Sequence, residues 1–230
     1  MRGGNGGGIK VISFDNYVDT DNVTAKVGID ETAFGVAGAQ WLVDTLGGQG
    51  NIIVLNGIAG SGVDEMRRSG AMSVFADYPD IKILGEAHAG WDYAQAKSAM
   101  ESFLSAYPQI DGVWSQGGAM TQAALDAFLA AGRSLIPMSG EANNGLLMAW
   151  KENLDKGFDS IAPCSPTFMS ASALETAIAA LNGEPVELHT IIELPFIVSD
   201  NLDGYVRMDL PDSFWNFTIL TPEQVDALYK

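Results

Sequence analysis

The chain has 230 residues, enough for one large domain or two small ones. Hydrophobic residues make up 47% of it and charged residues 18%, a composition that is typical of packed globular proteins and excludes a disordered chain. With 12 Lys and Arg against 29 Asp and Glu, the formal net charge is -17, so nucleic acid and anionic membranes are not expected as partners. The single cysteine excludes an intrachain disulfide.

Residues 1–8 are rich in glycine, and we interpret them as a flexible linker or a scar at a gene boundary. A phosphate-binding glycine loop would follow a strand, and since the sequence has no strand before this segment we do not expect one here. The segment also lacks the apolar core of a signal peptide, and no apolar run of the chain is long enough to span a membrane.

After the linker, short apolar runs alternate with segments of helical spacing. The predicted strands are residues 9–14, 26–29, 52–55, 81–84, 113–114, 135–138, 161–162 and 189–194. The predicted helices are residues 30–46, 63–74, 94–107, 120–131, 146–154 and 168–181. Strict alternation of this kind predicts an α/β fold, in which a parallel sheet is covered by helices on both faces.

The turn at residues 56–62 has three glycines in seven positions and joins a β-branched strand to a helix. In open α/β sheets, ligands bind at turns of this kind. We expect Val63, Met66, Gly70 and Val74 to form the buried stripe of the helix, with Arg67 just beside it, facing the turn.

Several pieces of the chain, in this order and spacing, resemble one known family. They are Val11-Ile12-Ser13-Phe14-Asp15, Gly57-Ile58-Ala59-Gly60 followed by Arg67 and Gly70, Gly90-Trp91-Asp92, Leu174-Glu175-Thr176, and Asn182-Gly183-Glu184-Pro185. The stretch from Gly57 to Gly70 is similar to the second lobe of periplasmic sugar-binding proteins of the ribose-binding type, which have the type I periplasmic-binding-protein fold, and the resemblance to these proteins runs from about Val11 to Leu194. The resemblance implies a periplasmic component of an ABC transporter, which captures a sugar or polyol between two lobes and presents it to a membrane permease.

The resemblance also implies a division of the chain. Residues 9–29 would be a hinge strand with a remnant of the first lobe, 30–163 a complete second lobe, and 164–195 a further first-lobe remnant. Residues 196–230 carry Tyr205, Phe214, Trp215 and Phe217, too many aromatic side chains for a free linker, so we expect this tail to pack on the body. A Thr-Pro-Glu-Gln sequence from Thr221 predicts a capped helix there.

Members of this family begin with several β-α units that have no counterpart here. We therefore expect a truncated form, with weak or undetectable solute binding because half of the cleft is absent. The incomplete first-lobe sheet would expose an unpaired edge, which favours self-association or pairing with a complementing chain.

The resemblance places four residues on the solute. A guanidinium such as that of Arg67 is a fixed fork suited to paired hydroxyls, although an ion pair on the helix surface is the alternative. Trp91, in a strand-to-helix turn, can stack on the C–H face of a sugar or plug the sheet edge. Asp15 and Asn16 end the first strand and can accept or donate hydrogen bonds there, or simply form a turn.

Four further positions fall where the family carries solute contacts but has other residues. They are Gln116 before a glycine pair, Glu141 and Asn143 after the fifth strand of the lobe, and Cys164 at a crossing between lobes. Each change removes or reshapes a sugar contact, so we expect a solute other than ribose.

Two other classes of protein remain as alternatives. An enzyme would need a nucleophile and base, such as Cys164 with His88 or His189, but neither histidine has a carboxylate partner that the sequence reveals. The glycine turn lacks the spacing of a dinucleotide-binding or phosphate-binding loop, so a Rossmann-like enzyme with a bound cofactor is not expected. The acidic residues lack the spacing of metal ligands, so a metal site is not expected either. The effector domain of a LacI-type transcription regulator shares the fold, but the acidity disfavours DNA.

Overall fold

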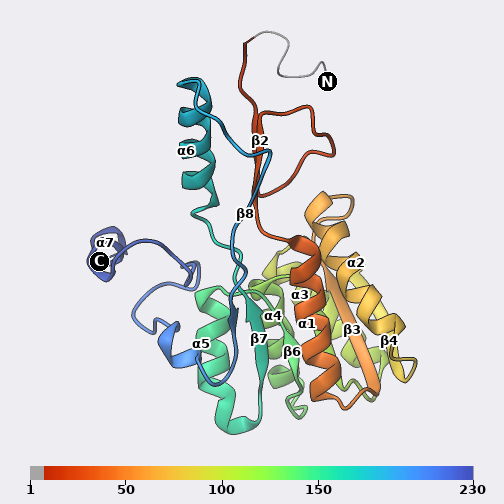
Figure 1. Cartoon of the computed structure of the whole chain (residues 1–230). Coiled ribbons are helices and arrows are strands. Elements are labelled where there is room, and N and C mark those ends of the chain that lie inside the picture. The colour runs from red at the N-terminus through yellow and green to blue at the C-terminus, as the bar shows by residue number, and fades with distance from the viewer. Residues whose placement is uncertain (1–7, 230) are drawn as a thin grey trace.

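The computed structural model describes residues 8–229, so the predicted linker lies outside the described residues except for Gly8. Its main body is a six-stranded sheet in the order β4-β3-β5-β6-β7-β9, parallel except for β9, which runs antiparallel to β7 (Figure 1). The strands are β3 (Gly50–Asn56), β4 (Ile81–His88), β5 (Gly112–Ser115), β6 (Met138–Ser139), β7 (Ser160–Pro163) and β9 (Phe196–Ile197).

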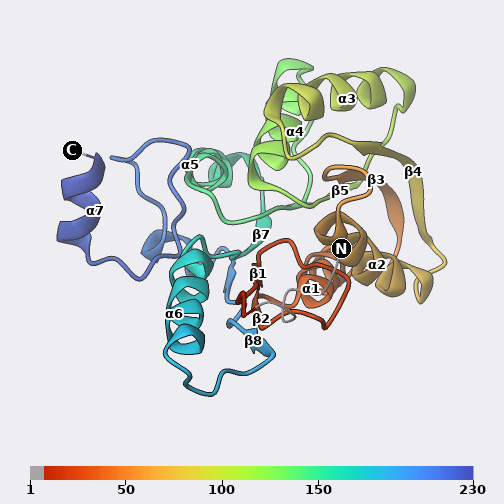
Figure 2. The ribbon, with the colours of Figure 1, turned by 90° about the horizontal axis from the view of Figure 1, so that it is seen from above.

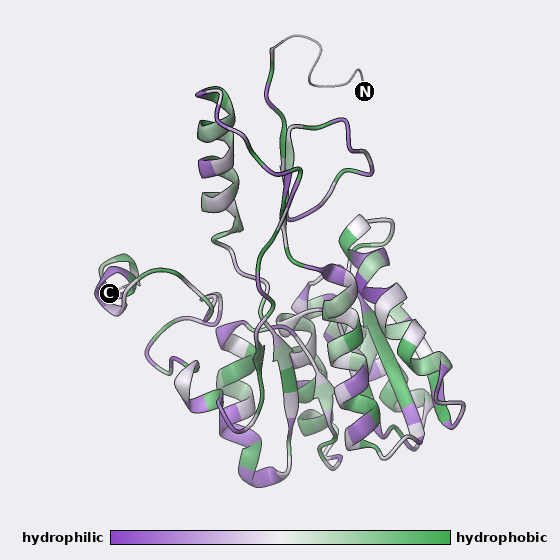
Figure 3. Cartoon of the chain, viewed as in Figure 1, coloured by the Kyte–Doolittle hydropathy of each residue, from purple (hydrophilic) through white to green (hydrophobic). Residues whose placement is uncertain are grey.

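Helices cover both faces of this sheet. They are α1 (Glu31–Thr45), α2 (Gly62–Ala76), α3 (Tyr93–Ala106), α4 (Gly118–Ala130) and α5 (Asn144–Asn153), followed by the 3₁₀ turn η1 (Leu154–Lys156). Alternate residues of β3 point to opposite sides, as the period of a strand requires. Ile52 and Val54 pack on α1 and α2, whereas Ile53 and Leu55 pack on α3, α4 and α5. The result is a strand whose central residues, 52–55, are hydrophobic (Figure 3).

A second, smaller sheet stands above the first. It consists of β1 (Ile12–Phe14), β2 (Ala25–Gly28) and β8 (His189–Ile191), all parallel, in the order β1-β2-β8. Helix α6 (Met169–Leu181) packs beside β1 and β2 (Figure 2). The chain passes between the two sheets three times, at residues 29–30, 164–168 and 192–195. The predicted α/β architecture with helices on both faces of a parallel sheet is confirmed.

Local chemistry sets the ends of several helices. Asp30, Asp92 and Asn143 each accept a backbone N–H at the start of α1, α3 and α5. Gly47 and Gly48, at φ +66° and +80°, end α1. The strand predicted at residues 135–138 is present but begins later, as Met138–Ser139, because Pro137 has no N–H to donate to the ladder.

The C-terminal segment, residues 198–229, starts beside the larger sheet and α5 and ends in a helix that is set apart from both (Figure 1). It contains the 3₁₀ turn η2 (Leu202–Gly204) and helix α7 (Pro222–Tyr229). Leu202 enters the main core, and Leu210, Phe214 and Val225 form a cluster of their own. The predicted cap of α7 is present, since Thr221 N donates to Gln224 Oε1 and Gln224 N donates to Thr221 Oγ1.

Candidate functional site

A cavity of about 400 Å³ lies where the carboxyl ends of the parallel strands of both sheets meet. Its walls come from the end of β1, from α2, from the turns after β4 and β6, from the crossing after β7, and from the C-terminal segment. The lining residues are Phe14, Asp15, Asn16, Val63, Arg67, Trp91, Glu141, Ser165, Thr167, Met169 and Trp215. The structure therefore brings together Asp15, Asn16, Arg67, Trp91 and Glu141, five of the eight residues predicted from the sequence.

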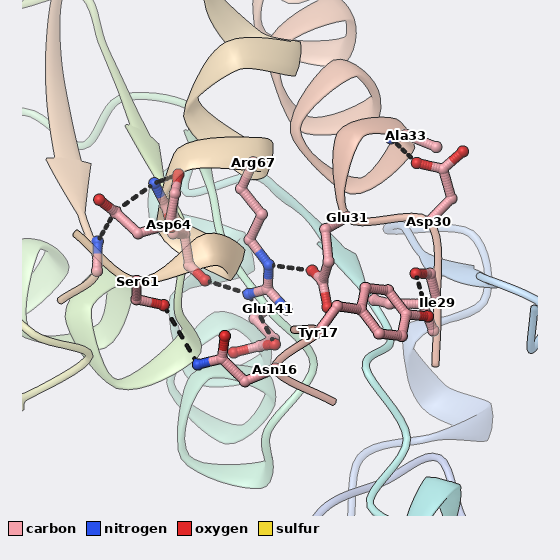
Figure 4. A network of polar contacts seen from close by, with 12 residues as sticks. Asn16, Tyr17, Ile29, Asp30, Glu31, Ala33, Ser61, Asp64, Arg67 and Glu141 are labelled. Atoms are coloured by element: carbon pink, nitrogen blue, oxygen red, sulfur yellow. Dashed lines mark hydrogen bonds and ion pairs between the residues drawn. The ribbon is translucent and has the colours of Figure 1, made fainter. Parts of the chain in front are cut away.

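Arg67 lies at the centre of the buried face of α2 and not beside it, which corrects the predicted stripe. Its Nε donates to Glu31 Oε2 at 2.6 Å, and its Nη1 donates to Glu141 Oε1 at 3.0 Å and to the carbonyl oxygen of Gln116 at 2.9 Å (Figure 4). The guanidinium carbon also lies 3.7 Å from the centre of the Phe34 ring. Since Nε and Nη1 are occupied, only Nη2 has no hydrogen bond within residues 8–229.

The neighbouring arginine behaves differently. Arg68 is half-exposed and makes a two-point contact with Glu86, from Nε at 2.9 Å and from Nη2 at 3.0 Å. It is the solvated arginine of the pair.

Close packing of α1 on α2 places Glu31 beside Arg67. A Cβ at Gly35 would overlap the carbonyl oxygen of Arg67, and a Cβ at Gly70 would overlap that of Thr32. Each glycine therefore lets one helix approach the backbone of the other. This approach brings the first residue of α1 within hydrogen-bond reach of the middle of α2.

The two carboxyl groups that contact Arg67 have raised pKa values. Burial raises the pKa of Glu31 to about 7, although the charge of Arg67 opposes the shift. Burial also raises the pKa of Glu141. Glu31 Oε1 is buried without a hydrogen-bond partner in the described part of the chain. Two carboxylates thus face one guanidinium, and the charge of Arg67 is already balanced by the protein itself.

Asp15 and Trp91 stand out by their backbone. They are the two non-glycine residues of the described range with positive φ, at +59° and +56°, and both line the cavity. Such conformations cost about 1–3 kcal/mol and gather at functional sites. Gly57 and Gly117 make room for the Trp91 ring, because a Cβ at either would overlap it. The buried Trp91 Nε1 has no acceptor among residues 8–229.

The other three predicted residues do not line this cavity. Gln116 is fully buried, and its Nε2 donates to Asp64 Oδ1 at 2.9 Å and to Asn56 Oδ1 at 3.2 Å. Asn143 accepts the N–H of Leu146 as the cap of α5. Cys164 is buried, and burial raises the pKa of its thiol to about 12, which disfavours a nucleophilic thiolate.

Both histidines have carboxylate neighbours that the sequence does not reveal. His88 Nδ1 lies 3.4 Å from Asp64 Oδ2, and His189 Nε2 lies 3.6 Å from Asp21 Oδ1. Neither histidine lines the cavity. Over residues 8–229 there is no group of His, Cys, Asp and Glu that could hold a metal ion, and no helix there is long and apolar enough to cross a membrane.

Sequence reasoning missed several residues of the site. Glu31 follows the Asp30 cap, and its distance of 36 positions from Arg67 hides the ion pair. Trp215 belongs to the aromatic C-terminal tail. The sequence predicted that this tail packs on the body, but not that it reaches the cavity. The others are Phe14, Val63, Ser165, Thr167 and Met169, which adjoin predicted turns or crossings.

Comparisons with known proteins agree with this architecture. A family model described as a periplasmic binding protein domain matches residues 5–185. The xylitol-binding protein of Mycolicibacterium smegmatis is 33% identical over 201 residues, covering 85% of this chain and 56% of that protein. The chain therefore spans little more than half the length of this relative.

Solved structures of solute-binding proteins share the fold of this chain. A solute-binding protein of an ABC transporter from Actinobacillus succinogenes, with bound D-allose, is 26% identical with a TM-score of 0.74, over 86% of this chain and 72% of that one. A solute-binding protein from Bacillus halodurans, with bound myo-inositol, is 25% identical with a TM-score of 0.79, over 86% and 69%. By the family match and the shared fold, this chain belongs to the periplasmic binding protein family.

Proposed function

We propose that this chain binds a small, neutral, polyhydroxylated solute, a sugar or polyol, in the cavity between its two sheets. The observation that carries the proposal is the pairing of Asp15 and Trp91. They come from different sheets, both have strained backbones, and both line one cavity. The family match and the names of the relatives, which are proteins that bind xylitol, D-allose and myo-inositol, support it.

The chemistry of the lining suits hydroxyl groups. The Trp91 indole lines the cavity and offers an apolar face for the C–H groups of a solute. The Asp15 carboxylate accepts from hydroxyls without a change of protonation. The hydroxyls of Ser165 and Thr167 can do both.

Charge around the cavity disfavours an acidic solute. Glu31 and Glu141 already take up the guanidinium of Arg67, and Asp15 adds a further carboxylate on the wall. A carboxylate or phosphate group would therefore meet more negative than positive charge. Arg67 acts here as a positioning residue that joins Glu31 on α1 to Glu141 after β6. Of its nitrogens, only Nη2 can still donate a hydrogen bond to a solute.

The intact protein would serve an ABC importer. We infer an extracytoplasmic binding component whose two sheets close on the solute by a hinge at the three crossings, and which delivers the solute to a permease. The smaller sheet has three strands and one helix, so it covers the solute sparsely, and we expect affinity of this chain in the millimolar range. The exposed apolar residues of α6, Leu174, Ile178 and Leu181, offer a surface for self-association or for a complementing chain.

No catalytic role is proposed. The Cys164 thiol is buried with a raised pKa, and both histidines lie outside the cavity lining. A binding role needs no such groups.

Calorimetric titration tests the proposal. The purified chain is titrated with xylitol, D-allose, D-ribose and myo-inositol, and with D-glucuronate as an anionic counterpart. At least one neutral solute is expected to bind, and glucuronate is not. Binding of glucuronate alone, or of no neutral solute even at high millimolar concentration, would contradict it, and micromolar affinity would overturn the expected weakness.

A further inference from the structure

The C-terminal segment supplies one wall of the cavity although it lies beyond residues 5–185, which the family model matches. Its contribution is the side chain of Trp215. Resting on the proposed function, we propose that Trp215 is a specificity-determining residue. It contacts the solute as a second aromatic wall and limits the size of solute that the cavity accepts.

Asn144, the first residue of α5, fastens the segment. Its Nδ2 donates to the carbonyl oxygens of Arg207 at 2.7 Å and Leu210 at 3.1 Å. Its Oδ1 accepts from Arg207 N at 3.0 Å and from Asn216 Nδ2 at 2.8 Å. Asn144 is fully buried, so these bonds are shielded from water.

The N-terminal end of α5 makes two further hydrogen bonds to the C-terminal segment. The N–H groups in the first turn of a helix have no partner inside the helix. Here Asn144 N donates to the carbonyl oxygen of Phe214 at 2.9 Å, and Gly145 N donates to that of Asp212 at 3.0 Å. Trp215 lies between Phe214 and Asn216, and both neighbours are bonded to Asn144. The backbone is therefore held on both sides of the indole.

The side chains next to Trp215 point elsewhere. Phe214 packs with Leu210 and Val225, and its ring lies 5.4 Å from that of Tyr229. The Phe217 ring lies 5.7 Å from that of Phe168, just before α6. The contact between Phe217 and Phe168 holds the segment beside the start of α6. Trp215 alone of this aromatic group lines the cavity.

Trp215 also borders two cavities. A second cavity of about 590 Å³ adjoins the first and is lined by Tyr93, Ala119, Gln122, Asn143, Asp212, Ser213 and Trp215. Trp215 is the one residue common to both linings. Removing the indole would join the two spaces, so the intact indole restricts the first cavity to a solute of about one sugar ring.

The test compares wild type with Trp215→Ala and Trp215→Phe. Each protein is titrated with D-allose, xylitol and myo-inositol, and with the disaccharide maltose as a size probe. Met208→Ala is the matched control, because Met208 is exposed in the same segment and lines neither cavity. Thermal unfolding of every variant shows whether the segment stays packed.

We expect Trp215→Ala to weaken binding of the best monomeric solute about tenfold, since an aromatic contact of about 1.4 kcal/mol is lost. Trp215→Phe should fall between Trp215→Ala and wild type, and Met208→Ala should match wild type. Maltose should bind to Trp215→Ala and not to wild type. If Trp215→Ala fails to fold, Trp215→Phe decides alone, with a severalfold loss expected.

The outcomes separate the two proposals. Wild-type binding with equal affinity in the Trp215 variants, and no gain of maltose binding, would overturn the role of Trp215 alone. Absence of any wild-type binding would overturn the proposed function and this inference with it. A loss in Met208→Ala equal to that in Trp215→Ala would show that disturbance of the segment, and not the indole, is responsible, and would also overturn it.

Discussion

Arg67 Nε donates to Glu31 Oε2 at 2.6 Å across the contact between α2 and α1, and both side chains are almost fully buried. Glu31 comes directly after the chain leaves the smaller sheet, and Arg67 lies on the helix that borders the cavity. The ion pair thus links the end of the crossing at residues 29–30 to the cavity wall. Because both charges are shielded from water, neither can lose its partner without a large cost.

Arg67→Met tests this link. The change leaves Glu31 and Glu141 buried without a cation, and we expect a loss of about 3–5 kcal/mol in the free energy of unfolding, measured in urea at pH 7.5 or above. Arg68→Met is the control, because Arg68 pairs with Glu86 at the surface and should cost less than about 1 kcal/mol. Equal losses in the two variants would contradict the buried role of Arg67.

The stability of the chain should depend on the protonation of Glu31. The folded chain keeps this proton up to about pH 7, whereas the unfolded chain releases it near the ordinary value of 4.5. The stabilisation is therefore fully present below pH 4.5 and is lost as the pH rises through 7, a change on the order of 3 kcal/mol. Urea unfolding across this range measures it.

Glu31→Gln removes the titrating group and should flatten that part of the pH profile. Glu86→Gln is the comparison, because the hydrogen bond from Arg68 lowers the pKa of Glu86. The contribution of Glu86 to the free energy of unfolding therefore has the opposite sign. This stabilisation is present above the pKa of the unfolded chain and is lost as the pH falls. A profile that is unchanged by Glu31→Gln would show that Glu31 does not titrate in this range.

Gly35→Ala should separate α1 from α2. The added methyl would overlap the carbonyl oxygen of Arg67, a rigid backbone atom, so the helices must move apart. We expect a loss of about 1–3 kcal/mol in the free energy of unfolding. Gly204→Ala, with nothing within 4 Å of the added carbon, should change stability by less than about 0.5 kcal/mol. Similar values for both would rule out the close approach of the two helices.

Asp15 allows binding and strain to be separated. Asp15→Gly and Asp15→Ala both remove the carboxylate, so both should weaken solute binding equally. Only glycine adopts φ of +59° freely, so we expect the alanine variant to be about 1 kcal/mol less stable than the glycine variant. Calorimetric titration and urea unfolding measure the two effects. Undiminished affinity in both variants would remove Asp15 from the site.

Much of the cavity wall was predictable because parallel strands end at one edge. Asp15, Trp91 and Glu141 each follow a strand of the predicted parallel order, so their meeting needs only the topology and not the packing. The caps of α1 and α7 were equally predictable, since each bond joins residues three positions apart. Gln116 was misplaced because it follows a strand but turns inward to Asp64, a choice that strand position does not specify.

The sequence by itself determined the alternation of strands and helices, the cap of α7, and the family resemblance, because these depend on neighbours within a few positions. Only the tertiary structure decided that Arg67 is shared between Glu31 and Glu141, and that Trp215 reaches the cavity from the C-terminal segment. These contacts join residues 36 or more positions apart. They depend on how closely two helices pack and on which carbonyl groups meet the first turn of α5, and neither leaves a periodic pattern in the chain.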